Sequence, residues 1–136
     1  MTVEGMTILA SRHPPAETVD RVVAAVAARG MAVMARIDHA AAAAKVGLEL
    51  RPTVVLMFGN PAVGTPLMQA KQTIGIDLPL KILVWQDAEG KTWLGYNEPH
   101  WIVTRHAAAI GADPAVGTMT KGLAAIAAEA ADGAMP

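Results

Sequence analysis

The sequence contains no cysteine and few aromatic residues, with one Phe, one Tyr and three Trp. A chain without thiols cannot form a disulfide, a cysteine nucleophile, a thiolate-bound zinc site or an iron–sulfur cluster. The formal net charge is −1, and the 11 basic residues are scattered along the chain. This balance gives no electrostatic basis for nucleic-acid binding. We therefore expect no nucleic-acid partner, no cofactor and no metal centre.

Long apolar runs are also missing. The hydrophobic fraction is 53%, but alanine supplies much of it, and Gly, Pro or polar residues interrupt the uncharged stretches. These stretches fall short of the ~18–20 residues that a membrane-spanning helix needs. The beginning of the chain has Glu4 near its front and no basic stretch before an apolar core, unlike a signal peptide. We expect a cytoplasmic protein with no membrane partner.

Three β-type segments in the middle of the chain organise the rest: Thr53–Phe58, Leu80–Gln86 and 91–96. They are rich in Val, Ile, Leu, Trp and Tyr, and Gly, Pro, Asn and Asp bound them. Residues 87–90 end in Gly and predict a hairpin turn between the last two segments. The first segment is almost wholly apolar. This pattern predicts a strand covered on both faces, or one in the core of a dimer.

The remaining pattern predicts two more strands and five helices in a single domain, residues 1–136. The predicted strands are Met6–Ser11 and 31–37, and the predicted helices are 15–29, 39–46, 66–73, 100–110 and a last helix from 114 that frays over 127–136. Asp38 and Asp113 are the expected helix caps. The predicted order is β-α-β-(α)-β-α-β-β-α-α.

Three short motifs carry a family resemblance: FGNP at 58–61, DLPLKILVW at 77–85 and YNEP at 96–99. With them the chain resembles the DUF302, or TT1751-like, family of small bacterial proteins of uncharacterised function. The resemblance covers about residues 6–105. It implies an α+β, TBP-like fold with a curved, mostly antiparallel sheet backed by helices, and it implies a homodimer. Many relatives have Cys at the positions of Gly59 and Leu80, so a thiol or metal role does not carry over.

Asn60 and Lys81 are the sharpest polar candidates for a ligand site. Asn60 lies between a strand and a helix start, where backbone N–H groups could bind an anion; an ordinary turn before Pro61 is the simpler explanation, because it alone accounts for the residue types. Lys81 interrupts an apolar strand, where it could line a pocket and face Asp77 or an anionic ligand. Alternatively, its stem could lie over an exposed sheet face.

The aromatic candidates are Trp85 and Trp93, which we expect to approach each other across the hairpin, while Tyr96 points to the other side of the sheet. They could form a wall of an apolar pocket together with Leu83. Cross-strand packing or a dimer contact is the simpler explanation, because aromatic residues serve packing first. The four His residues show no paired metal-ligand spacing.

These observations favour a non-catalytic dimeric binding module for a small apolar or amphipathic molecule. Its apolar part would contact Trp85 and Trp93, and its polar or acidic end would meet Asn60, Lys81 or Arg36. Arg36 ends the second strand and could approach Asn60 if their strands are neighbours. Two alternatives stay open: an interaction dimer without a ligand, and an enzyme that uses Lys81 or a His as a base near Asp77.

Overall fold

The computed structural model describes residues 1–107 and 113–132. Its elements in chain order are β1 (Met6–Ser11), α1 (Pro15–Ala28), β2 (Val33–Asp38), α2 (His39–Lys45), β3 (Thr53–Phe58), α3 (Pro61–Ala70), the 3-10 helix η1 (Gln72–Ile76), β4 (Leu80–Gln86), β5 (Thr92–Asn97), α4 (Pro99–Arg105) and α5 (Pro114–Ala131). The predicted order is confirmed, with η1 as an addition.

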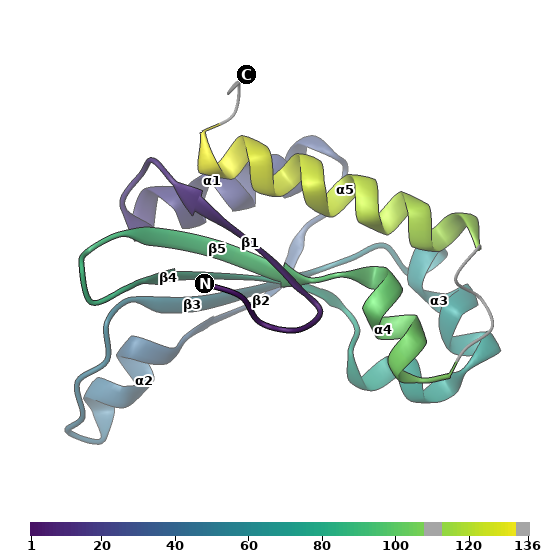
Figure 1. The fold of residues 1–136 in the computed structure, drawn as a ribbon, viewed down its shortest axis with the longest axis horizontal. Coiled ribbons are helices and arrows are strands. Elements are labelled where there is room, and N and C mark those ends of the chain that lie inside the picture. Colours follow the sequence, from purple (N-terminus) through teal and green to yellow (C-terminus); the bar gives the residue numbers. More distant parts are fainter. Residues whose placement is uncertain (108–112, 133–136) are drawn as a thin grey trace.

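The five strands form one antiparallel sheet in the order β1-β5-β4-β3-β2. Helices α1 and α5 lie side by side across one face of this sheet (Figure 1). The predicted α+β class with an antiparallel sheet backed by helices is therefore confirmed. The edge strands β1 and β2 are not paired with each other, so the sheet is open.

The sheet holds its helices through the alternation of side chains along β3. Val54, Leu56 and Phe58 are buried, whereas the residues between them are only partly covered. Successive side chains of a strand point to opposite faces, so the buried set lies on the face under α1 and α5. The prediction that β3 is covered on both faces within the chain is wrong, because both long helices pack on the same side.

Helix α1 contributes Val19, Val22 and Val26 to this core, at the spacing that places them on one helical face. Helix α5 contributes Leu123 and Ile126. Tyr96 lies in the same core, as predicted from its position on β5. Together these side chains form one apolar layer between the sheet and the two helices.

The predicted fraying from residue 127 is wrong for the part that is described. Helix α5 continues to Ala131, and Ala127, Ala130 and Ala131 are buried. Arg21 Nε donates a hydrogen bond to the Ala130 carbonyl at 3.1 Å. Alanines carry little hydrophobic signal in a sequence, but their small side chains allow α5 to pack closely on α1. Residues 133–136 lie outside the described residues.

Two other helix boundaries differ from the prediction. Helix α3 begins at Pro61 rather than at residue 66, because Asn60 caps it and Pro is well tolerated at a first helical position. Helix α4 covers Pro99–Arg105. The end of the predicted helix 100–110, and the break predicted at Gly111 and Ala112, lie outside the described residues.

A second, smaller core extends the molecule beyond the end of the sheet. It joins α3, η1, α4 and the beginning of α5, and its buried members are Leu67, Ile74, Ile102, Val103, Val116 and Met119. Figure 1 shows these elements together at the end of the sheet opposite α2. Helix α5 belongs to both cores, so it joins this end of the molecule to the sheet.

The other side of the sheet carries a second set of largely apolar side chains. We call it the open sheet face and define it by Ile8, Ile37, Val55, Leu83, Trp85 and Trp93, which the strand registers place on the same side. Most of these side chains are partly exposed. Their neighbours shield them, but α1 and α5 do not.

The two faces of β3 provide a test of this arrangement. We expect Leu56→Ala to lower the free energy of unfolding by about 2–5 kcal/mol, because it leaves a cavity in a fully buried site. Met57→Ala, one position along the strand on the open sheet face, should cost clearly less. Urea unfolding of the two variants measures the difference, and equal losses would contradict the assignment of faces.

Candidate functional site

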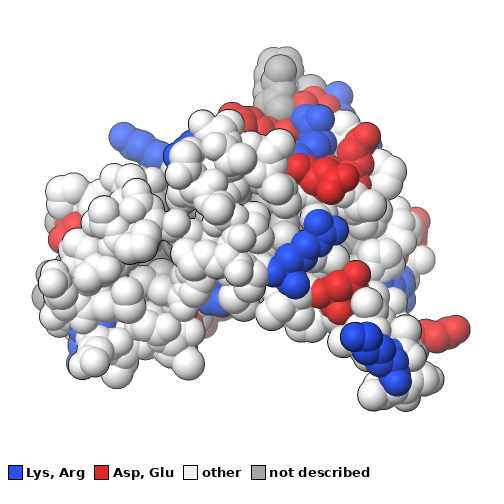
Figure 2. Space-filling view, turned by 180° about the vertical axis from the view of Figure 1, so that it is seen from behind, with Lys and Arg blue, Asp and Glu red and all other residues white. Residues whose placement is uncertain are grey.

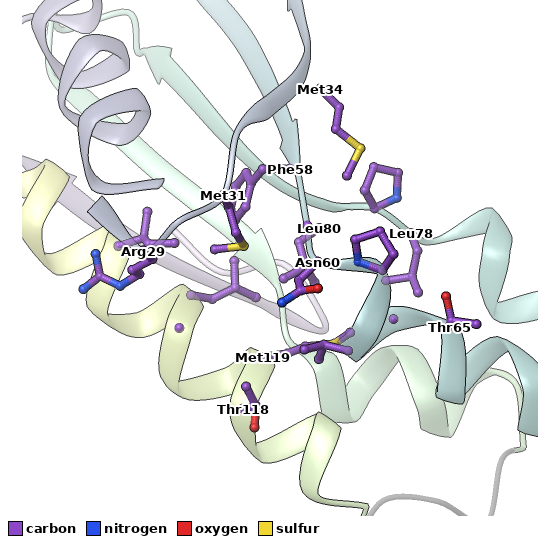
Figure 3. A pocket seen from close by; sticks show the side chains of 18 of the residues that line it. Arg29, Met31, Met34, Phe58, Asn60, Thr65, Leu78, Leu80, Thr118 and Met119 are labelled. Carbon is purple, nitrogen blue, oxygen red and sulfur yellow. The ribbon is translucent and has the colours of Figure 1, made fainter. Parts of the chain in front are cut away.

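A cavity of about 460 Å³ lies where the end of the sheet meets the second core. Its lining combines the end of β3, helix α3, the segment before β4 and one side of α5, and Figure 3 shows side chains from these elements around it. The apolar part of the lining consists mainly of Met31, Met34, Phe58, Val63, Met68, Leu78, Leu80, Met119, Leu123 and Ile126. This is the candidate functional site.

Glycines leave the space for this cavity. Gly64 and Gly122 lie within helices and line the cavity, although Gly is an unfavourable residue there. A Cβ atom at Gly122 would meet no other atom within 4 Å, so the lining is open at this position. A Cβ atom at Gly64 would lie 3.5 Å from Leu78, so here the helix approaches the segment before β4 closely.

Four methionines give the lining an adaptable surface: Met31, Met34, Met68 and Met119. Met34 is the residue at which the pairing of β2 with β3 shifts register, between Val33 and Ala35. A β-bulge of this kind re-aims a side chain, and here Met34 lies at the cavity. Methionine side chains are flexible and polarisable, which suits binding of apolar groups of varied shape.

Arg29 is the charged residue among the described residues that line the cavity. It is already paired: its Nη2 donates to Glu129 Oε1 at 2.8 Å, and its Nη1 donates to Glu129 Oε2 at 3.1 Å. A third bond joins Nη1 to the Ala25 carbonyl at 3.0 Å. The hydrogen bond from the Arg29 guanidinium holds the pKa of Glu129 below its ordinary value.

Asn60 lies at the mouth of the cavity and is exposed. Its Oδ1 accepts a hydrogen bond from the Ala62 backbone N–H at 2.9 Å, so the residue caps α3. The N–H groups of Val63 and Gly64 donate to the Asn60 carbonyl. The backbone donors at this helix start are thus engaged within the chain, which leaves little to bind the anion considered for this position.

The structure does not bring the five predicted site residues together. Asn60 borders the cavity, on the side of the sheet that holds α1 and α5. Lys81, Trp85 and Trp93 lie on the opposite face, because Lys81 pairs with Met57 and Trp85 pairs with both Thr53 and Trp93. The predicted Trp wall therefore shares its face of the sheet with Lys81, as expected, whereas Asn60 lies on the other side.

Arg36 also lies apart from Asn60. It pairs with Leu56 in the middle of β3 and is exposed on the edge strand. The antiparallel pairing places Asp38 beside Val54, at the other end of β3 from Asn60. The expectation that these residues could meet Asn60 was wrong because it did not fix the strand direction. Asp38 caps α2 as predicted, accepting from the Ala41 N–H at 2.9 Å.

Lys81 and the two tryptophans have partners of their own. Lys81 Nζ donates to the carbonyls of Pro79 at 3.0 Å and Asp77 at 3.2 Å, so it meets the backbone of Asp77 rather than its carboxylate. Burial lowers the pKa of Lys81, and the nearby charge of Asp77 opposes this effect. Trp93 Nε1 donates to Asp87 Oδ2 at 2.8 Å in the hairpin turn. Trp85 and Trp93 are cross-strand neighbours, as predicted.

Near Asp77 the structure shows a hydrogen-bonded cluster that contains a His, as the enzyme alternative expected, although the sequence did not indicate which His. His106 Nε2 lies 2.6 Å from Asp77 Oδ2, and His106 Nδ1 lies 2.9 Å from Thr73 Oγ1. Arg105 Nη1 donates to both Asp77 carboxylate oxygens at 2.8 and 2.9 Å. These residues lie 28–33 positions apart in pairs, so a search for local motifs cannot find them.

This cluster has hydrogen bonds of the kind that a general base of an enzyme makes, but its residues do not line the cavity. A His that donates from Nε2 to a carboxylate offers Nδ1 to a hydroxyl, which is the arrangement of a general base. Catalysis also needs a cleft for the substrate. The cavity is lined by Gly75 and Leu78, on either side of Asp77, but not by Thr73, Asp77 or His106.

Most residues that line the cavity could not be predicted from the sequence. Methionines and helical glycines line it, and the available signal was the presence of Gly64 and Gly122 inside helices where they weaken the fold. Within residues 1–107 and 113–132, no group of three or more His, Asp or Glu side chains is arranged to hold a metal ion. In the same ranges, no helix has the length and apolar character to cross a membrane.

The fold and site define an α+β domain with a five-stranded antiparallel sheet, two helices on one face and an apolar cavity at the end of the sheet. The family described as "Domain of unknown function DUF302" matches residues 7–126. The chain belongs to this family, which confirms the resemblance drawn from its motifs.

A solved structure shows the same fold. The crystal structure of an uncharacterized conserved DUF302 protein from Bacillus stearothermophilus superposes with a TM-score of 0.83 and covers 94% of this chain and 99% of that chain. The two sequences are 21% identical, so the comparison supports the fold alone.

Curated relatives are similar in sequence but longer. "Fluoride-specific ion channel FluC 1" of Brucella suis biovar 1 (strain 1330) is 47% identical over 118 residues, which are 87% of this chain and 46% of that protein. "Fluoride-specific ion channel FluC 2" of Brucella melitensis biotype 1 (strain ATCC 23456 / CCUG 17765 / NCTC 10094 / 16M) has the same identity over the same length, which is 44% of that protein. The chain thus spans less than half the length of these relatives.

The Asp77 cluster predicts how stability depends on pH. Burial acts to raise the pKa of Asp77, but hydrogen bonds from His106 and Arg105 outweigh it, so the pKa is lowered. A lowered pKa in the folded state stabilises the protein above the unfolded value of about 3.9, and this contribution is lost as the pH falls through the folded pKa.

We therefore expect Asp77→Asn to reduce the free energy of unfolding by about 1–3 kcal/mol at pH 7, through loss of charged hydrogen bonds. The difference from the wild type should shrink as the pH falls below about 4. Urea unfolding at a series of pH values measures this. Asp20→Asn, on the exposed side of α1, is the control and should change little. A loss for Asp77→Asn that did not depend on pH would contradict the role of the carboxylate.

Proposed function

We propose that this protein is a non-catalytic binding module whose cavity takes up a small apolar or amphipathic molecule. The single observation that carries the proposal is the cavity of about 460 Å³ with a mainly apolar lining. Its volume lies in the range of about 300–1,000 Å³ that is usual for small-molecule sites, and such sites are mainly apolar with a few polar groups.

The surface around the cavity supports this proposal. In the view from behind in Figure 2, charged side chains gather over the half of the molecule that holds α2, and the half with α3 and α4 shows few of them. An apolar ligand can approach such a surface without displacing strongly bound water from charged groups. The ligand would then contact the methionines that line the cavity and the surface of α5 at Gly122.

The curated relatives that carry the channel name are more than twice as long as the segment that matches this chain. The matched segment would be a binding or partner domain within those proteins. Channel activity is therefore not part of the function proposed for this chain.

A substitution at Gly122 tests the proposed site. Gly122→Leu places a side chain into the open part of the cavity, so we expect the affinity for a neutral apolar dye, N-phenyl-1-naphthylamine, to fall at least about tenfold. Dye fluorescence measures this directly. The fluorescence of Trp85 and Trp93 is a poor reporter, since both lie on the other side of the sheet.

Gly117→Leu is the matched control. It lies on the same helix, a Cβ atom there also meets no other atom within 4 Å, and Gly117 does not line the cavity. Both substitutions should stabilise α5 by about 0.5–1 kcal/mol, because Gly is an unfavourable helix residue. Equal dye binding by the wild type and both variants would remove the support for this site.

Self-association is a second proposed function, and a separate feature of the structure supports it. The α2 arm, which we define as residues 39–51, projects from the sheet on the side away from α1 and α5 (Figure 1). Helix α2 has no buried residue, and Val46, Leu48 and Leu50 are 72%, 64% and 48% exposed. A seven-residue helix of this kind gains little stability by itself.

The occupant that fits this surface is a second copy of the chain. A sheet of five strands, four of six residues and one of seven, measures about 24 by 20 Å, so the open sheet face would bury about 960 Å² over two copies. This is close to the lower limit of about 1,000 Å² for a specific interface. Adding the α2 arms would exceed that limit, and in a two-fold dimer each arm can cover the open sheet face of the partner.

Val46→Asp tests this dimer. We expect wild-type protein to have the mass of a dimer in light scattering, and Val46→Asp to shift it towards the monomer, because a charge is buried at the contact. Ile76→Asp is the control, since Ile76 is 73% exposed but lies in η1, away from the arm. A wild-type protein that stays monomeric on concentration would contradict the proposal.

A further inference from the structure

The charge state of the cavity restricts what can bind there. Arg29 is the cationic residue among the described lining residues, and both of its terminal nitrogens are bonded to Glu129. A carboxylate ligand would have to displace Glu129, or lose its own water without gaining a free cation. Burying an ionised carboxylate without a partner is strongly unfavourable.

The backbone at the start of α3 gives no compensation. The N–H of Ala62 donates to Asn60 Oδ1, and the N–H groups of Val63 and Gly64 donate to the Asn60 carbonyl. An anion would have to break these bonds to reach the helix dipole. Both features that usually attract an acidic ligand, a cation and a helix start, are thus satisfied internally.

The side-chain amide of Asn60, unlike Arg29 and the backbone N–H groups, has a donor that can face a ligand. Its oxygen is used as the α3 cap, which directs its Nδ2 group away from the helix. Figure 3 shows this amide between Leu80 and Met119 in the cavity lining. An amide nitrogen donates hydrogen bonds and cannot accept them. Two threonines also line the cavity: Thr118 already donates its hydroxyl to the Pro114 carbonyl at 3.0 Å, and Thr65 is exposed.

The size of the cavity sets the size of the ligand. A cavity of about 150 Å³ accepts benzene, so by proportion the cavity of about 460 Å³ suits a molecule of roughly 15–20 non-hydrogen atoms. Flexible methionines on several sides allow a chain or a ring system to fit.

We infer that the ligand is an uncharged, mainly apolar molecule of this size with one hydrogen-bond acceptor, such as an ester or a ketone, which accepts from Asn60 Nδ2. The inference rests on the proposed binding function and restricts it to one class of ligand. It also replaces the acidic end group that the sequence suggested for Asn60.

A matched pair of probes tests whether a neutral ligand binds more tightly than an anionic one. Methyl dodecanoate and dodecanoate differ mainly in the charge of the end group, and the binding of both can be measured by displacement of N-phenyl-1-naphthylamine from the protein. We expect the ester to displace the dye at a concentration at least about tenfold lower than the anion, because the anion must be buried without a partner. Equal or tighter binding of dodecanoate would overturn the inference.

Two substitutions test whether Glu129 and Asn60 produce this preference for a neutral ligand. Glu129→Gln frees Arg29 from its ion pair, so dodecanoate should bind several-fold more tightly while the ester is unchanged. Asn60→Asp keeps an oxygen that can cap α3 but removes the amide donor. Its affinity for the ester should fall several-fold, whereas its affinity for the dye and its melting temperature should stay close to those of the wild type.

These outcomes separate the two proposals. If neither probe nor the dye binds, or if Gly122→Leu leaves dye binding unchanged, the proposed function fails and the ligand class fails with it. If the dye binds and Gly122→Leu abolishes binding, but dodecanoate matches the ester, only the ligand class fails. If Asn60→Asp leaves the ester affinity unchanged, Asn60 does not bind the ligand. The preference for a neutral ligand would then depend on the Arg29–Glu129 pair alone.

Discussion

The packing of one face of the sheet against α1 and α5 is the contact on which the rest of the structure depends. Alternate residues of β3, β4 and β5 supply the sheet side of this layer, and a stripe of Val on α1 supplies part of the helix side. The side-chain period of a strand is two, so the same packing that buries Leu56 leaves Val55 on the other face. The buried core and the open sheet face are therefore two consequences of one register.

The cavity follows from the length of α5, which runs past the end of the sheet into the second core. There it faces α3 and the segment before β4, where Gly64 allows α3 to approach that segment closely and Gly122 leaves the lining of α5 open. The polar groups nearby are mostly satisfied by each other, as the Arg29–Glu129 pair shows. The lining of this cavity therefore offers shape and apolar contact rather than free charge.

Local sequence signals predicted most elements because they act over a few residues. Pro and Asp predicted the starts of α1, α2 and α5, the turn at 87–90 predicted the hairpin, and the side of the sheet taken by Tyr96 followed from counting along β5. The motifs around Asn60 led to the correct family. The same signals failed for the end of α5, because buried alanines are recognised by what packs on them and not by their own hydrophobicity. They failed for Arg36 because strand direction is not a local property.

The sequence by itself determined the class of fold, the order of the elements and the two faces of β4 and β5, because backbone preferences and apolar periodicity are local. Only the tertiary structure decided which polar residues share a site. It separated Asn60 from Lys81, Trp85 and Trp93, since the sheet lies between them, and it joined Asp77 to His106 across 29 positions. It also created the cavity, which no single segment contains. Distances between segments depend on how the helices pack on the sheet, and that packing is a property of the whole chain.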